Sequence, residues 1–463
     1  MTVQPPTAPR IPATAPASAP ISAPIAAPVA APFVPGATAA VPPASVPLGF
    51  LAAAGVGLVT FGLAAWFSAD RIVDMPTHPG SVAAVHVGML AFLTTAVLGA
   101  AHQFTPVVGR RPLRSVPAAR VTLVGMVATA WLLPSGFAHG PEALVLAGGI
   151  TGAATVLLAA WNLSGPLSAR DGGVPLVGLR VSIAYLILTV AFGVTYAIDR
   201  QTLWFPLLPN RVLAHAHLGL IGWLGITYVS VAEKLWPMFL LAHRPRARAG
   251  ACAVGLLGTG VGVLAVGLLL ESPIVVALGG TVVVAGFGCH IASLVGVVRA
   301  RRRPLELLHR FLFTSTAFLV VAIALGVAAA LAPVDYGTRS RLVSAEIASL
   351  AAWLGLAVIG HVHKIVPFIG YSALRARGVT HAPSGKPLMF ADLFQPEVAR
   401  ATLITSGAGF ALAVIGILVG SSTVIALGGI GIATAGVLVT ANLVSGPRRV
   451  TRASARSAAA TAA

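Results

Sequence analysis

The sequence predicts an all-α polytopic membrane protein with twelve transmembrane helices in three pseudo-repeated four-helix arcs. Of its 463 residues, 57% are hydrophobic and 9% are charged, whereas about 25% of the residues in a soluble domain are charged. Apolar runs recur along most of the chain, each near the roughly 20 residues that a helix needs to cross a bilayer. Three segments also share one spacing of polar and proline positions, which suggests an internal repeat. This composition excludes a conventional soluble enzyme.

The chain begins with a Pro- and Ala-rich segment, residues 1–46, which we expect to be a disordered cytoplasmic tail. Twelve spans should form the transmembrane domain, residues 47–446. Each should be helical because backbone polar groups in lipid must bond internally. The expected spans start near Pro47, Ser81, Val116, Glu142, Val174, Arg211, Arg248, Pro273, Glu306, Arg341, Arg400 and Ser422. Residues 447–463 should be a basic cytoplasmic tail.

Basic residues give the orientation. Most arginines fall in loops on one side of the predicted membrane, and Lys234 and Lys364 lie at helix ends on that side. The other side has only Arg71, Arg200, Arg211, Arg339 and Arg341. The positive-inside rule therefore places the arginine-rich side and both termini in the cytoplasm, with the chain in the cell membrane. The formal charge of +18 lies in these loops, so the expected partner is the lipid bilayer and not nucleic acid.

Three segments share one frame: HVGMLAFLTTAVLGAAHQFTP from His86, HLGLIGWLGITYVSVAEKLWP from His217 and IASLAAWLGLAVIGHVHKIVP from Ile347. Each has a His or Glu at position +16 and a proline at +20. The starts are 131 and 130 residues apart (217−86 and 347−217). The predicted unit is therefore four helices, with arcs at about 47–170, 171–304 and 305–446, and repeated membrane proteins place their sites at repeat interfaces.

The first positions of this frame should form an outer layer with His86 and His217. Helix 6 opens with Ala-His-Ala-His, so His215 and His217 lie about 200° apart around the helix axis and should face different neighbours. Histidine inside a bilayer usually faces the bundle interior, and a neutral imidazole is a natural ligand for haem iron. The alternative for these rings is an interhelical hydrogen bond or exposure at the interface.

The +16 positions should form a second layer with His102, His363 and Glu233. His361 and His363 form a second pair with the two-residue spacing, near the inner end of helix 10. We expect these three histidines to lie near the cytoplasmic boundary, where solvated rings are common, although they remain candidate metal ligands. Glu233 should pair with Lys234 or pass protons. Glu346, near the outer end of helix 10, allows the same two interpretations.

Common soluble-enzyme motifs are missing. The sequence has no Walker A, GxSxG or HExxH motif, and no GxGxxG between a strand and a helix. Its two cysteines, Cys252 and Cys289, stand alone within apolar segments. Nucleotide hydrolysis, serine hydrolysis and zinc protease chemistry therefore have no support.

The segment AHAHLGLIGWLGITYVSVAEKLWPMF resembles the HxH-led helix of subunit I in the haem-copper oxidase superfamily, nearest to the cbb3-type oxidase and nitric oxide reductase branch. The twelve-helix count also resembles that subunit. The resemblance implies haem b ligation, with His215 and His217 as the ligand pair and His86 as the helix 2 ligand. It departs from the family in two places. The HxH pair lies on helix 6, where the family has it on helix 10, and helix 7 lacks the histidines that bind copper.

Three hypotheses follow. In the first, the chain is a membrane haem protein, a divergent oxidoreductase that transfers electrons or binds a diatomic gas, using His86 with His217 or His215. It would exchange electrons with a membrane or periplasmic partner, and its use of copper is left open. In the second, the chain is a transporter or channel-like protein. In the third, it is a cofactor-free accessory protein for assembling copper sites or respiratory complexes.

Overall fold

The computed structural model describes residues 41–242 and 247–462, with side chains for 41–242 and 248–452. The predicted N-terminal tail falls almost wholly outside the described residues, as does His243. Twelve helices are long and apolar enough to cross a membrane, and their starts lie within five residues of those predicted. The prediction of an all-α, twelve-span membrane protein is confirmed.

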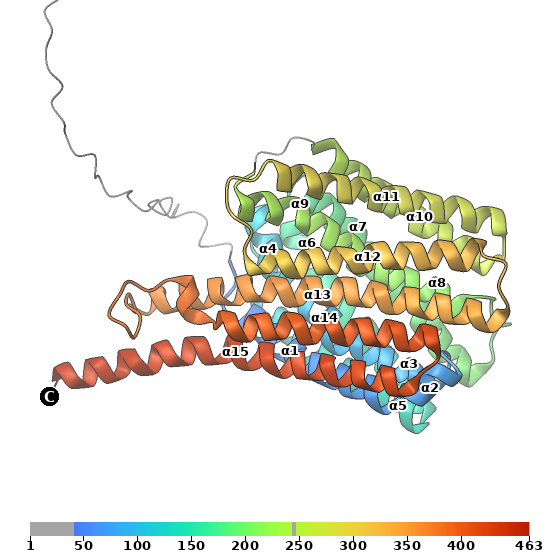
Figure 1. Ribbon diagram of the computed structural model, residues 1–463, viewed down its shortest axis with the longest axis horizontal. Coiled ribbons are helices and arrows are strands. Elements are labelled where there is room, and N and C mark those ends of the chain that lie inside the picture. Colours follow the sequence, from blue (N-terminus) through green and yellow to red (C-terminus); the bar gives the residue numbers. More distant parts are fainter. Residues whose placement is uncertain (1–40, 243–246, 463) are drawn as a thin grey trace, which may run out of the picture. The chain divides into compact units, whose positions relative to one another are not determined.

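The first half of the chain forms six spans, two of which are interrupted (Figure 1). The single-segment spans are α1 (Ser45–Phe67), α5 (Val116–His139), α6 (Glu142–Leu167) and α7 (Gly173–Thr202). The second span joins α3 (Pro79–His86), the π-helix η2 (Val87–Thr94) and α4 (Thr95–Gly109). The sixth joins α8 (Arg211–His217), the π-helix η3 (Leu218–Gly225) and α9 (Ile226–Leu240). The short helix α2 (Ala69–Asp74) links α1 to α3.

The second half has six uninterrupted spans. They are α10 (Ala247–Leu269), α11 (Pro273–Arg299), α12 (Leu307–Leu331), α13 (Tyr336–Ala376), α14 (Pro396–Val419) and α15 (Ser422–Ala462). The 3-10 helix η4 (Phe390–Leu393) lies in the loop before α14. Helix α15 continues beyond Pro447 into the predicted basic tail.

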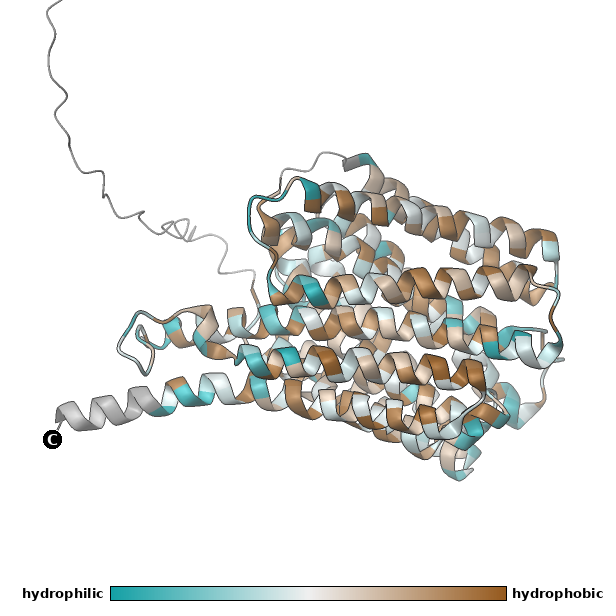
Figure 2. Cartoon of the chain, viewed as in Figure 1, coloured by the Kyte–Doolittle hydropathy of each residue, from teal (hydrophilic) through white to brown (hydrophobic). Residues whose placement is uncertain are grey.

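Short connections make successive spans antiparallel, so the bundle has two ends of different charge. At one end α1 begins, α4 ends and most of the arginines lie, and we call it the arginine-rich end. At the other end, the arginine-poor end, α1 ends and α8 begins. Figure 2 shows apolar residues along the spans and hydrophilic residues gathered near the helix ends. This distribution is the one expected of helices that face lipid along their length.

The second, sixth and tenth spans form the centre of the bundle. In these spans 61%, 72% and 61% of the most apolar window is buried, against 22–44% in the other nine. These are the three segments that share the sequence frame. The polar residues that they carry are therefore withdrawn from lipid, where an unpaired polar group would cost several kcal/mol.

One aromatic residue from each of these three spans contacts another of the three spans, so that the contacts form a closed ring of three. At position +6 of the frame stand Phe92, Trp223 and Trp353, all buried. Each packs against position +8 of another span. Trp223 Nε1 lies 3.4 Å from Thr94 Oγ1. A Cβ atom added at Gly225 would lie 3.3 Å from Trp353, and one added at Gly355 would lie 3.5 Å from Phe92. A threefold arrangement of arcs would produce this cycle, although true repetition of the arcs stays a prediction.

Candidate functional site: histidines of the central spans

Two histidines of the central spans face each other near the arginine-poor end. His86 is the last residue of α3 and His215 lies in α8, and each is within about two turns of the start of its span. Their ring centres are 6.3 Å apart and the ring planes differ by 25°. The structure thus brings together one predicted ligand from the first arc and one from the second.

Both histidines lie where a regular helix gives way to a π-helix. Segment η2 begins directly after His86, and η3 begins directly after His217. Such π segments are rare and often occur at functional sites. The third central span, α13, is an uninterrupted α-helix at the same level and carries Ile347 in place of a histidine. Among the described spans, only the second and the sixth, which carry histidines at this level, contain a π segment.

Backbone contacts define which ring nitrogen of His86 is free. His86 Nδ1 lies 2.8 Å from the carbonyl oxygen of Val82. A carbonyl only accepts hydrogen bonds, so Nδ1 carries the proton and Nε2 keeps its lone pair. In the partner ring, His215 Nδ1 is buried and has no hydrogen-bond partner among the described residues. The pair therefore offers the neutral nitrogen donors that bind transition metals.

The surroundings of the pair are mostly apolar. Phe137 lies 5.3 Å from the His86 ring and Phe192 lies 5.9 Å from the His215 ring, measured between ring centres. Gly193 follows Phe192, and a Cβ atom there would come within 3.3 Å of His215 Cε1. The absence of a side chain at Gly193 therefore lets the His215 ring pack closely against the α7 backbone.

His217 has a different neighbour. Its Nε2 lies 3.4 Å from Glu346 Oε1 of α13, and its Nδ1 lies 2.8 Å from the carbonyl oxygen of Leu213. The rings of the HxH pair therefore face different partners, as their two-residue spacing predicted. Because Glu346 occupies His217 Nε2, His215 is the member of the pair that faces His86.

The deeper histidines are buried, so the expectation that they would be solvated is wrong. His102, His361 and His363 are 0%, 9% and 5% exposed. In each, Nδ1 lies 2.7–2.8 Å from the carbonyl oxygen four residues earlier. Their Nε2 atoms are buried and have no hydrogen-bond partner within the described parts of the chain. Close packing of the central spans shields rings that sequence position alone places near the boundary.

These deeper rings do not converge on one point. His102 stacks on Phe50 and His363 stacks on Phe311, each with ring centres 5.3 Å apart. His361 instead lies 6.2 Å from Tyr228. The described residues contain no group of three or more His, Cys, Asp or Glu side chains placed to hold a metal ion.

Sequence reasoning missed the cluster around Tyr228. His290 of α11 lies 5.7 Å from the Tyr228 ring and Trp353 lies 5.5 Å from it. The Tyr228 hydroxyl and both ring nitrogens of His290 are buried without a partner among the residues that the structure describes. A phenol within an apolar span was the available signal, since polar groups in such segments usually face the bundle interior.

The two glutamates also have defined surroundings. Glu346 contacts His217, as described above. Glu233 is 4% exposed, and its Oε1 accepts a hydrogen bond of 2.7 Å from Ser293 of α11. Its predicted pairing with Lys234 and its role in proton transfer stay predictions.

No protein-family model matches the sequence, and no curated protein matches it. The fold and the paired histidines still define a class: the chain is a multi-pass α-helical membrane protein in which part-buried imidazoles from the second and sixth spans face each other.

Proposed function

We propose that the chain is a haem-binding electron-transfer protein of the cell membrane, a divergent relative of haem-copper oxidase subunit I. In this proposal His86 and His215 are the two axial ligands of a haem b. The observation that carries it is the 6.3 Å separation of the two ring centres. A transition metal bonds an imidazole nitrogen at about 2.0 Å, so rings on opposite sides of one metal have centres roughly 6 Å apart.

The residues around the pair fit a haem. The lone pair on His86 Nε2 and the unpartnered His215 nitrogen supply two donors of the kind that haem iron takes. A haem also carries two carboxylates, for which cations are suitable partners. Arg211 lies 5.7 Å from the centre of the Tyr196 ring, which itself contacts Phe192, and is the candidate cation. Arg200 lies 5.6 Å from the centre of the Phe137 ring but is already paired with Glu142.

Electron transfer is favoured over gas binding. A haem in a protein supplies one-electron redox chemistry, and gas binding needs an open axial position. Histidines on both sides would fill the two axial positions. Because the arginine-rich end should face the cytoplasm, the His86–His215 pair would lie toward the outer face and exchange electrons with a partner on that side.

Absorption spectra of the purified full chain test the proposal. We expect a Soret band and, after reduction, a b-type α band. His86→Ala and His215→Ala should each abolish or strongly shift these bands. His217→Ala and the exposed His139→Ala are the matched controls and should retain them. A wild-type chain without a Soret band, or unchanged spectra in both the His86 and His215 variants, would refute the proposal.

A further inference from the structure

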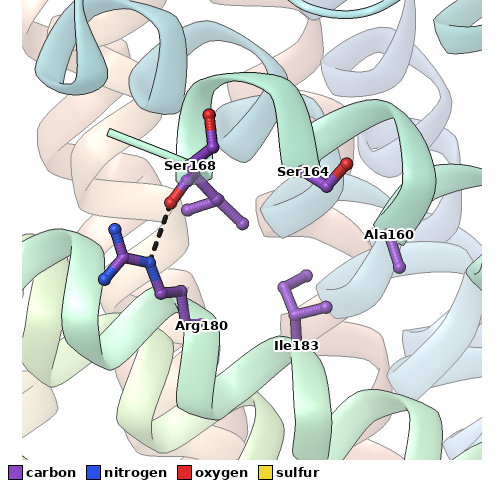
Figure 3. A pocket seen from close by; sticks show the side chains of 6 residues that line it. Ala160, Ser164, Ser168, Arg180 and Ile183 are labelled. Carbon is purple, nitrogen blue, oxygen red and sulfur yellow. Dashed lines mark hydrogen bonds between the residues drawn. The ribbon is translucent and has the colours of Figure 1, made fainter. Parts of the chain in front are cut away.

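A groove of about 320 Å³ lies between α6 and α7 at the arginine-rich end (Figure 3). Ala160 and Ser164 on α6, and Ser168 directly after it, face Arg180 and Ile183 on α7 across the groove. Leu167 completes the lining. One part of the lining is apolar and the other carries hydroxyl and guanidinium groups. The groove is therefore amphipathic at the level where a membrane changes from hydrocarbon to headgroups.

Three arginines converge on the polar part of this groove. Arg111 Nη1 donates to Ser168 Oγ over 2.8 Å, and Arg114 Nε donates to Ser164 Oγ over 2.7 Å. Arg180 Nε donates to the carbonyl oxygen of Leu167 over 2.8 Å, and its Nη2 donates to that of Ala169. These contacts hold the guanidinium groups in place around two hydroxyls.

The hydroxyls themselves are oriented toward the arginines. Ser164 Oγ donates to the carbonyl oxygen of Trp161 and Ser168 Oγ donates to that of Gly165, both over 2.7 Å. Their lone pairs are thus left to accept from the arginines. Each guanidinium has five N–H donors, so every arginine keeps several of them for another acceptor.

No carboxylate of the described residues contacts the three arginines to balance their positive charge. None of the ion pairs between described residues involves Arg111, Arg114 or Arg180. Arg114 lies 5.8 Å from the centre of the Trp161 ring, and Trp161 is 49% exposed. Tryptophan is enriched at the headgroup level of membranes, which places the arginines at the depth of lipid phosphates.

We propose that the α6–α7 groove binds an anionic phospholipid. Arg111, Arg114 and Arg180 would contact the phosphate and the remaining headgroup oxygens, since guanidinium groups bind phosphate in bidentate geometry. Ala160, Leu167 and Ile183 would pack against the first part of an acyl chain. Basic pockets between transmembrane helices bind anionic headgroups in this way.

A second groove provides the matched control. It is also about 320 Å³ in volume and is lined by Arg448, Arg449 and Arg452, all on α15, with Ala441, Val444 and Ser445. Replacing its three arginines by glutamine removes the same charge as the triple variant Arg111→Gln, Arg114→Gln, Arg180→Gln. The two variants differ in which groove loses its cations.

Native mass spectrometry of the full chain in detergent tests the proposal with phosphatidylglycerol, phosphatidylcholine and inorganic phosphate as probes. We expect phosphatidylglycerol to bind at least about tenfold more weakly to the α6–α7 triple variant than to the wild type. The α15 variant should bind it as the wild type does. Ile183→Trp keeps all three arginines but fills the apolar part of the groove, and it should also weaken binding. It provides an independent test in case the triple variant does not fold.

Three results would overturn the proposal: equal phosphatidylglycerol binding by the wild type and both α6–α7 variants, an equal loss in the α15 variant, or equal binding of phosphatidylcholine. Displacement of the lipid by millimolar inorganic phosphate would also overturn it, because a site for free phosphate does not need the apolar part of the groove.

Discussion

His217 Nε2 lies 3.4 Å from Glu346 Oε1, and this contact joins the sixth span to the tenth. Both side chains are largely buried, with 9% and 15% of their surfaces exposed. The contact occupies the ring nitrogen of His217 that a metal would need. It therefore separates the roles of two histidines that stand only two residues apart, leaving His215 to face His86.

We predict that Glu346→Ala lowers the free energy of unfolding by about 1–3 kcal/mol, because it leaves a buried imidazole nitrogen without its partner. Thermal unfolding in detergent, followed by tryptophan fluorescence, measures the change. The haem spectrum should be unaffected. Glu346→Gln is the control, since its amide can still bond His217 and should restore much of the stability. A shifted Soret band in Glu346→Ala would show that His217 contributes to the cofactor site.

Ser293→Ala should destabilise the protein by about 1–3 kcal/mol, the range for removing one partner of a buried hydrogen bond. The Ser293 hydroxyl donates to Glu233 Oε1 over 2.7 Å in the buried space between α9 and α11. The midpoint of thermal unfolding, compared with that of the wild type, checks this expectation. Ser293→Thr keeps the donor and should lie closer to the wild type than Ser293→Ala. The reverse order would mean that packing, and not the hydrogen bond, determines stability at this position.

The sequence predicted the helices and the depth of their polar residues better than their lateral contacts. Span length and apolar composition determine where a helix crosses the bilayer, and the rise of about 1.5 Å per residue places His86 and His215 at a similar level. Lateral neighbours depend on the rotation of each helix. The π segments η2 and η3 change that rotation, so the regular 3.6-residue period could not identify the faces of His102 and Tyr228. Nor could it identify Glu346 as the partner of His217.

Asn162 near the end of α6 and Asn442 in the middle of α15 make corresponding contacts, but Asn442 makes one more. Asn162 Oδ1 accepts from the Ser115 amide over 2.8 Å, while its Nδ2 has no partner among described residues. Asn442 Oδ1 accepts from the Gln395 amide over 2.7 Å, and its Nδ2 donates to the Gln395 carbonyl over 3.0 Å.

We therefore predict that Asn442→Ala costs more stability than Asn162→Ala, about 2 against about 1 kcal/mol, since each net hydrogen bond contributes about 1 kcal/mol. Chemical or thermal unfolding of the two variants, run side by side, gives the comparison. Asn162 and Asn442 are 0% and 2% exposed, so a difference in solvent exposure cannot explain a larger loss of stability in Asn442→Ala. Equal losses would mean that the second hydrogen bond of Asn442 adds nothing to stability.

Gly57 determines how closely α1 approaches the π-helix η2. A Cβ atom at Gly57 would lie 2.1 Å from the carbonyl oxygen of Ala91 and 2.3 Å from its carbonyl carbon. Backbone atoms cannot rotate away as a flexible side chain can, so Gly57→Ala must separate the two helices. The same displacement would move η2, which begins directly after His86.

Gly57→Ala should lower the free energy of unfolding by about 3 kcal/mol or more, at the upper end of the range for overpacked interiors. It should also weaken the proposed haem bands by displacing His86. Gly255→Ala on α10 is the control, because no described atom lies within 4 Å of the added methyl group, and alanine stabilises a helix by about 0.5–1 kcal/mol relative to glycine. Thermal unfolding and absorption spectra of both variants test the pair. If Gly57→Ala were as stable as Gly255→Ala, α1 could not approach η2 as closely as described. The position of His86, which directly precedes η2, would then have to be rejected as well.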